Sequence, residues 1–84
     1  MTDNRYIIIG RSNCPFCTAA VDYCTGAGMQ HVFLDYVNAQ EVLQDYKDFH
    51  NHPTVPIILE NNLETGRVTK VGGYQDFIKL FLKE

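Results

Sequence analysis

The hydrophobic positions of the chain fall into short uninterrupted runs and into stripes of helical spacing. Residues 6–10, Tyr-Ile-Ile-Ile-Gly, are apolar on both faces, which is typical of a strand buried inside a sheet. Residues 31–35, His-Val-Phe-Leu-Asp, predict a second strand. Two further strand-like segments, residues 55–59 and 67–71, are separated by an Asn-rich stretch that ends in Gly66, and this pattern predicts a hairpin.

Three helices are expected between and after these strands. Pro15 suits the first turn of a helix, because its missing N–H would have no partner there, and Gly26 and Gly28 are expected to end that helix. Asn38 and Glu41 resemble a capping box at the start of the second helix. The apolar stripes of the three helices are Ala19, Ala20, Tyr23, Cys24 and Ala27; then Val42, Leu43, Tyr46 and Phe49; and finally Tyr74, Phe77, Ile78, Phe81 and Leu82.

The order of elements is therefore β-α-β-α-β-β-α. The first two strands are expected to be parallel and joined by a right-handed crossover through a helix, and the last two to form an antiparallel pair. The 84 residues predict a single domain, 1–84, of the α/β class. Its core would be an open four-stranded mixed sheet flanked by helices on both faces.

Composition and charge narrow the possible functions. The net charge is −3 and the seven Lys and Arg residues are scattered, so nucleic acid is not expected as a partner. No apolar stretch approaches the roughly 20 residues of a membrane helix, and residues 1–9 lack the pattern of a secretory signal. Three cysteines fit poorly with a disulfide-stapled secreted fold, so a reducing cytoplasmic location is expected. In that compartment a close cysteine pair is catalytic or metal-binding more often than structural.

Cys14 and Cys17 form such a pair, and their position favours redox chemistry. Cys14 follows a predicted strand and turn and precedes Pro15, which places its sulfur at a helix N-terminus, where free N–H groups favour a thiolate. Arg11 adds a positive charge in the same turn. Cys17 lies one helical turn further along and is expected to be more enclosed. An exposed low-pKa thiol beside a sheltered one suits thiol–disulfide exchange, in which Cys14 attacks and Cys17 resolves.

Three segments together resemble the motifs of dithiol glutaredoxins. They are R-S-N-C-P-F-C at residues 11–17, T-V-P at residues 54–56 and G-G-Y-Q-D at residues 72–76. The resemblance spans nearly the whole chain and implies a thioredoxin-like fold with a cis bond between Val55 and Pro56. It also implies a glutathione-disulfide oxidoreductase in electron transport and cell redox homeostasis, which reduces protein disulfides and glutathione mixed disulfides. Glutathione would be the co-substrate and no metal would be needed. The partners implied are disulfide-containing or glutathionylated proteins, with ribonucleotide reductase as one candidate, for a cytoplasmic monomer.

The resemblance further implies a glutathione site. The backbone of Val55 would pair with glutathione as an added strand, and Gly72 and Gly73 would let the ligand approach closely. Asp76 would accept the ammonium group of the γ-glutamyl end, and the adjacent helix start would offer N–H groups to its carboxylate. From the residues alone, an alternative remains in which the glycines end a strand and Asp76 caps a helix. The full set implied in glutathione binding is Arg11, Phe16, Thr54, Val55, Pro56, Gly73, Tyr74 and Asp76.

Two positions depart from the pattern of these proteins. Pro53 stands just before T-V-P, where a basic residue often helps to hold the glycyl carboxylate of glutathione; Lys47, His50 and His52 are candidates to replace it. Tyr74 stands where Cys, Ser or Asn is more usual, and its ring could alter substrate preference while a backbone contact survives.

Two other redox functions stay open. One is a glutaredoxin that binds a [2Fe–2S] cluster, against which both Pro15 and Cys17 argue. The other is a glutaredoxin-like electron donor recharged by thioredoxin reductase, an alternative that Pro53 favours and that Arg11 and Asp76 oppose.

The remaining cysteine and the histidines suggest no separate site. Cys24 lies two helical turns after Cys17 and is expected to be a buried core thiol. A structural zinc site with His31, His50 or His52 is disfavoured, because the usual second ligand pair is missing.

Overall fold

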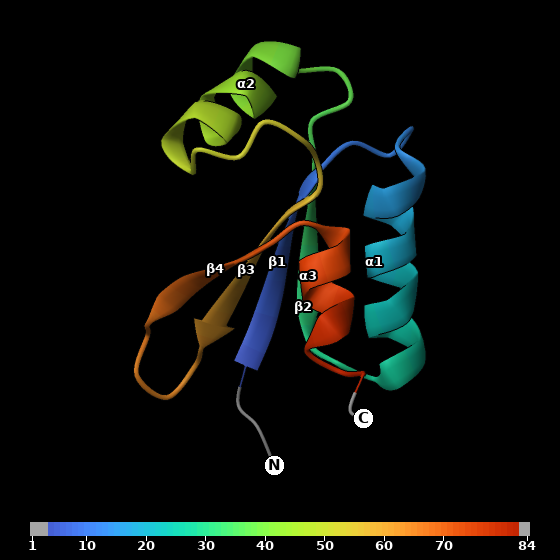
Figure 1. Ribbon diagram of the computed structural model, residues 1–84, viewed down its shortest axis with the longest axis vertical. Coiled ribbons are helices and arrows are strands. Elements are labelled where there is room, and N and C mark those ends of the chain that lie inside the picture. The colour runs from blue at the N-terminus through green and yellow to red at the C-terminus, as the bar shows by residue number, and fades with distance from the viewer. Residues whose placement is uncertain (1–3, 83–84) are drawn as a thin grey trace.

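The computed structural model describes residues 4–82 and contains the elements in the predicted order (Figure 1). Residues 1–3, part of the stretch without a predicted secretory signal, lie outside the described residues. Within residues 4–82, no helix is long and apolar enough to cross a membrane. The strands are β1 (Asn4–Gly10), β2 (His31–Asp35), β3 (Ile57–Asn62) and β4 (Val68–Gly72), and the helices are α1 (Pro15–Ala27), α2 (Gln40–Phe49) and α3 (Tyr74–Lys79).

The four strands form one mixed sheet in the order β2-β1-β3-β4. Strands β1 and β2 are parallel, with Ile8 opposite Phe33, whereas β1 and β3 are antiparallel, with Ile8 opposite Ile58. Strand β4 pairs antiparallel with β3, as the predicted hairpin requires. The two central strands carry the longest apolar runs, because a strand with neighbours on both edges and helices on both faces is shielded from water throughout.

Helices cover both faces of the sheet and create two hydrophobic clusters. Helices α1 and α3 lie side by side on one face, where Ile8, Cys24 and Phe77 are buried together (Figure 1). Helix α2 contributes Leu43 to the other face, where it packs with Ile9 and other β1 and β3 residues. This arrangement is the thioredoxin-like α/β fold, and it confirms the predicted class.

The predicted start of the second helix was wrong. Ala39 occupies the N-cap position of α2, and no side chain caps the helix. The N–H groups of Val42 and Leu43 donate to the Ala39 carbonyl instead, at 3.1 and 3.2 Å. The Asn38–Glu41 capping box therefore does not form, because the helix begins one residue later than that box requires.

Other boundaries also differ from the prediction, and strands β1, β3 and β4 are shifted by one to three residues at their ends. Gly26 lies inside α1, and Gly28 alone ends that helix by donating its N–H to the Thr25 carbonyl at 3.2 Å. Strand β3 begins at Ile57, two residues later than expected, and α3 ends at Lys79, before the last residues of its apolar stripe. Helix and strand ends depend on caps and tertiary packing, which periodicity alone does not reveal.

Candidate active site

The turn between β1 and α1 places Cys14 at the start of a helix. Cys14 is the N-cap residue of α1 and has extended backbone angles, with Pro15 directly after it in the first turn. Its N–H donates to the Arg11 carbonyl at 3.2 Å, and its carbonyl accepts the N–H of Thr18 at 3.1 Å. The predicted position of the first cysteine is therefore confirmed.

Asp35 anchors this turn to the end of β2, a role that the sequence analysis did not anticipate. One carboxylate oxygen, Oδ1, accepts the N–H of Ser12 at 2.9 Å and the N–H of Val37 at 3.1 Å. Desolvation opposes ionisation of Asp35, but the hydrogen bonds from Ser12 and Val37 outweigh it and lower the pKa of this carboxyl. The sequence did contain a signal for this role, because Asp35 stands at the carboxyl end of a strand that was predicted to be parallel to β1. The turn that carries Cys14 (residues 11–14, the redox turn) leaves β1 at that same end of the sheet.

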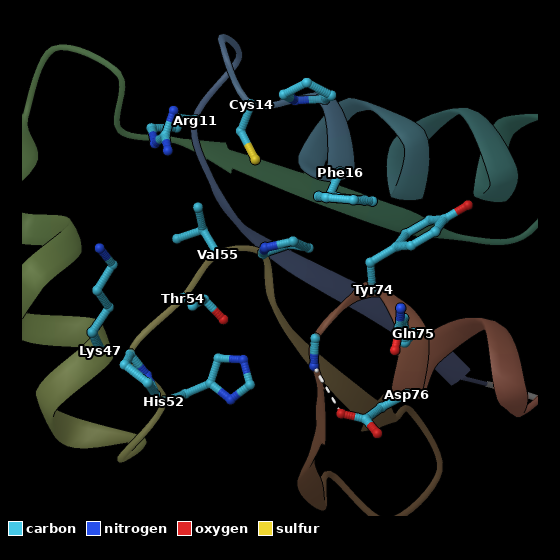
Figure 2. Close-up of a pocket in the computed structure, with 14 residues that line it drawn as sticks. Arg11, Cys14, Phe16, Lys47, His52, Thr54, Val55, Tyr74, Gln75 and Asp76 are labelled. Atoms are coloured by element: carbon cyan, nitrogen blue, oxygen red, sulfur yellow. Dashed lines mark hydrogen bonds between the residues drawn. The ribbon is translucent and has the colours of Figure 1, made fainter.

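The surroundings of Cys14 favour its thiolate. Burial raises the pKa of this thiol, but interactions with the backbone N–H and thiol of Cys17, the N–H of Phe16 and the charge of Arg11 outweigh it, so the pKa is lowered. The prediction of an exposed Cys14 was wrong, since only 6% of the residue is exposed. Its sulfur points into the cleft that the residue lines (Figure 2).

Cys17 has the opposite environment. It is fully buried against Gly10, where a Cβ atom would overlap its sulfur. Burial, together with its hydrogen bond to Cys14 and the charge of that group, raises the pKa of Cys17 to about 12. The backbone N–H of Arg11 only partly opposes this effect. Because the two pKa values move in opposite directions, the thiolate is favoured on Cys14 over Cys17.

A cleft of about 700 Å³ lies in front of Cys14. It is formed where the redox turn, the segment before β3 and the start of α3 meet, three segments that are far apart in the sequence (Figure 2). All eight residues implied in glutathione binding line it, whereas Cys17 does not. The complete lining consists of Arg11, Cys14, Pro15, Phe16, Lys47, His52, Pro53, Thr54, Val55, Pro56, Gly73, Tyr74, Gln75 and Asp76.

The segment before β3 and the start of α3 have the expected local geometry. The Val55–Pro56 peptide bond is cis, which confirms the prediction. Gly72 has a φ of +125°, and a Cβ there would overlap the Asp76 side chain, so both backbone angle and space require glycine. Asp76 Oδ2 accepts the Gly73 N–H at 3.3 Å and thereby caps α3. Asp76 therefore caps a helix and at the same time lines the cleft, so the cap does not remove it from the candidate site.

Of the three candidates to replace the basic residue at position 53, two line the cleft. Lys47 and His52 do so, whereas the His50 ring packs against Phe49 at 4.9 Å between centroids. Burial and the nearby charge of Lys70 lower the pKa of His52, and Asp76 opposes the shift. The lowered pKa favours the neutral form of His52, so Lys47 and Arg11 are the basic side chains of the cleft best suited to pair with an anion.

Cys24, His31 and His50 do not line this cleft. Cys24 is fully buried beside Tyr6 and Phe77, and burial raises the pKa of its thiol, as expected for a core cysteine. In the part of the chain that the structure describes, no three His, Cys, Asp or Glu side chains come together in a way that could hold a metal ion.

Comparison with known proteins gives matches at the level of structure only. No protein-family model matches the chain, and no curated protein does. A wheat glutaredoxin superimposes with a TM-score of 0.75 and 22% identity, covering 90% of this chain and 69% of that one. Reduced Escherichia coli glutaredoxin superimposes with a TM-score of 0.66 and 26% identity, covering 90% of this chain and 91% of that one. A glutaredoxin from Archaeoglobus fulgidus superimposes with a TM-score of 0.61 and 12% identity, covering 99% of this chain and 89% of that one.

Proposed function

We propose that this chain, a thiol–disulfide oxidoreductase of the glutaredoxin fold, takes its electrons from glutathione and reduces protein disulfides and glutathionylated thiols. The observation that carries the proposal is the cleft in front of Cys14. The residues implied in glutathione binding come from three separate segments, and all of them line this one surface.

The chemistry begins with the Cys14 thiolate, which attacks one sulfur of the substrate disulfide. A new S–S bond forms between Cys14 and that sulfur as the substrate S–S bond breaks, and the second sulfur leaves as a thiolate that takes up a proton. For a protein disulfide, Cys17 loses its proton, attacks the Cys14 sulfur and releases the substrate. Two electrons have then passed from the dithiol to the substrate, and two glutathione molecules restore the dithiol as they become oxidised glutathione.

A glutathionylated thiol needs only the first cysteine. Cys14 attacks the glutathione sulfur, the protein thiol leaves, and a second glutathione then releases Cys14. The raised pKa of the buried Cys17 is consistent with this division of labour, because a protonated Cys17 competes slowly with external glutathione.

Charges in the cleft support a small anionic peptide as ligand. Lys47 and Arg11 could pair with the carboxylates of glutathione, and Asp76 with its ammonium group. Val55 lies just outside the ladder of β3, which begins at Ile57, so its backbone groups could pair with an extended peptide. Lys47, from α2, would then supply the charge that Pro53 lacks. The proposal keeps a cytoplasmic monomer as the working form and ribonucleotide reductase as one candidate substrate.

The test is reduction of a glutathionylated peptide in the presence of glutathione and glutathione reductase. We expect Cys14→Ser to abolish turnover, Cys17→Ser to retain much of it, and Cys24→Ser, as the control, to match the wild type. If Cys17→Ser is as inactive as Cys14→Ser, the monothiol route is wrong. If the wild type shows no turnover while Cys14 still reacts with a simple thiol reagent, glutathione is not the electron source, and recharging by thioredoxin reductase becomes the better hypothesis. A brown purified protein would point to the iron–sulfur alternative.

A further inference from the structure

An aromatic pair forms one wall of the cleft. Phe16 lies between the two cysteines in the sequence, and Tyr74 is the first residue of α3. Their ring centroids are 5.6 Å apart and the ring planes are inclined by 38°. Figure 2 shows both rings at the same edge of the cleft, below the start of α1, with the Tyr74 hydroxyl directed away from Val55.

Folding does not explain the position of Phe16. The residue is 57% exposed and belongs to neither hydrophobic cluster, whereas Tyr74 packs against the cluster beneath α1 and α3. A phenylalanine ring in water forgoes the stabilisation that burial would provide. Exposed apolar surface beside a reactive group is typical of a surface that binds a ligand.

Glutathione contacts are implied for Phe16 and Tyr74, but glutathione has no apolar group that would fill the space between the two rings and the cleft. It carries two carboxylates and one ammonium group, for which the cleft has Arg11, Lys47 and Asp76, but it has no apolar side chain besides its cysteine. A polypeptide substrate does have such side chains next to its cysteines. The aromatic wall therefore fits a polypeptide substrate better than it fits glutathione.

We propose that Phe16 and Tyr74 bind an apolar or aromatic side chain adjacent to the reacting cysteine of a polypeptide substrate, and so select protein disulfides with such neighbours. This inference rests on the proposed function, because it takes Cys14 as the nucleophile. The Cys14 thiolate forms a disulfide with the substrate sulfur beside the apolar residue, the substrate S–S bond breaks, and the other sulfur leaves as a thiolate. Cys17 then displaces the substrate, so both electrons come from the cysteine pair. The aromatic pair acts on substrate binding.

The experiment measures single-turnover reduction by the prereduced protein without glutathione. The substrates are two peptide disulfides that carry phenylalanine or serine on both sides of each cysteine, with rates normalised to reduction of the same peptides by dithiothreitol. We expect the phenylalanine peptide to react about tenfold faster at low peptide concentration, the order given by one aromatic ring packing on others. Phe16→Ser and Tyr74→Ser should each reduce this ratio to about twofold or less.

Phe49→Ser is the matched control. Phe49 is 83% exposed on α2 but does not line the cleft, so its loss should leave the tenfold ratio unchanged. Because Tyr74 also packs against the core, Phe16→Ser keeps the test decisive if Tyr74→Ser fails to fold.

Equal rates for the two peptides, or a ratio that persists in Phe16→Ser, would overturn the inference. Failure to reduce either peptide would overturn it together with the proposed oxidoreductase activity. A preserved peptide preference in a protein that shows no turnover with glutathione would support the aromatic site and refute only the glutathione dependence.

Discussion

Replacing Gly10 by alanine should destabilise the fold and disturb the cysteine pair. Gly10 is the last residue of β1, and a Cβ added there would overlap the sulfur of Cys17 and lie 3.3 Å from the Cys17 Cβ. Cys17 is fully buried on the inner face of α1, so it has no open space into which it can turn. The new methyl group must therefore push α1 away from the end of the sheet.

The size of the effect follows from packing. Forcing an extra methyl group into a close-packed interior costs about 1–3 kcal/mol. Alanine also restricts the unfolded chain, which returns about 0.4–1 kcal/mol. The free energy of unfolding should therefore fall by about 1–2 kcal/mol, and a chain of this size would lose about 4–16 °C in Tm.

Thermal unfolding of the reduced protein, followed by circular dichroism, measures this change. Gly26→Ala is the matched control, because Gly26 lies in α1 with no atom within 4 Å of an added Cβ. This control should gain about 0.5–1 kcal/mol through the helical preference of alanine. In Gly10→Ala the displaced Cys17 should also interact less with Cys14, and the pKa of the Cys14 thiol should rise as a result. A Gly10→Ala protein that melts at or above the wild-type temperature, with an unchanged Cys14 pKa, would refute this reasoning.

Two further predictions concern the redox turn. The alkylation rate of Cys14 should rise with pH and reach half its maximum at a lower pH than that of a free cysteine, because the lowered pKa populates the thiolate earlier. Cys17→Ala should move this midpoint upward, since the Cys17 thiol then no longer stabilises the Cys14 thiolate; a wild-type midpoint at or above that of a free cysteine would contradict the account. Asp35→Ala should lower the urea midpoint of unfolding and slow disulfide reduction, because the N–H of Ser12 loses its anchor on β2. Asp22→Ala, an exposed change on α1, should affect neither, and equal behaviour of the two variants would show that the anchor is unimportant.

The sequence predicted the fold well because the strong signals were local and agreed with one another. The apolar runs that became β1 and β3 are buried on both faces, and Pro15 begins α1 as expected. The errors lie at element ends. Asn38 and Glu41 have suitable residue types for a capping box, but α2 begins at Gln40, beyond the reach of that motif.

The site was predicted less completely, for a physical reason. The three motif segments could be recognised because each has characteristic residues, and the structure brings them to one cleft. The anchoring role of Asp35, the fit of Gly10 against Cys17 and the burial of Cys14 depend on contacts between residues distant in sequence. The contact between Phe16 and Tyr74 is of the same kind, and it appears only when α1 and α3 are placed side by side.

The most direct test of the central claim is to identify which cysteine accepts glutathione. Reduced Cys17→Ser protein would be mixed with oxidised glutathione, digested and analysed by mass spectrometry. The account predicts one glutathione on Cys14 and none on Cys24, whereas the wild type should end with a Cys14–Cys17 disulfide and no bound glutathione. Modification of Cys24, or equally fast modification of Cys17 in the Cys14→Ser protein, would contradict the assignment of Cys14 as the nucleophile in a glutathione-binding cleft.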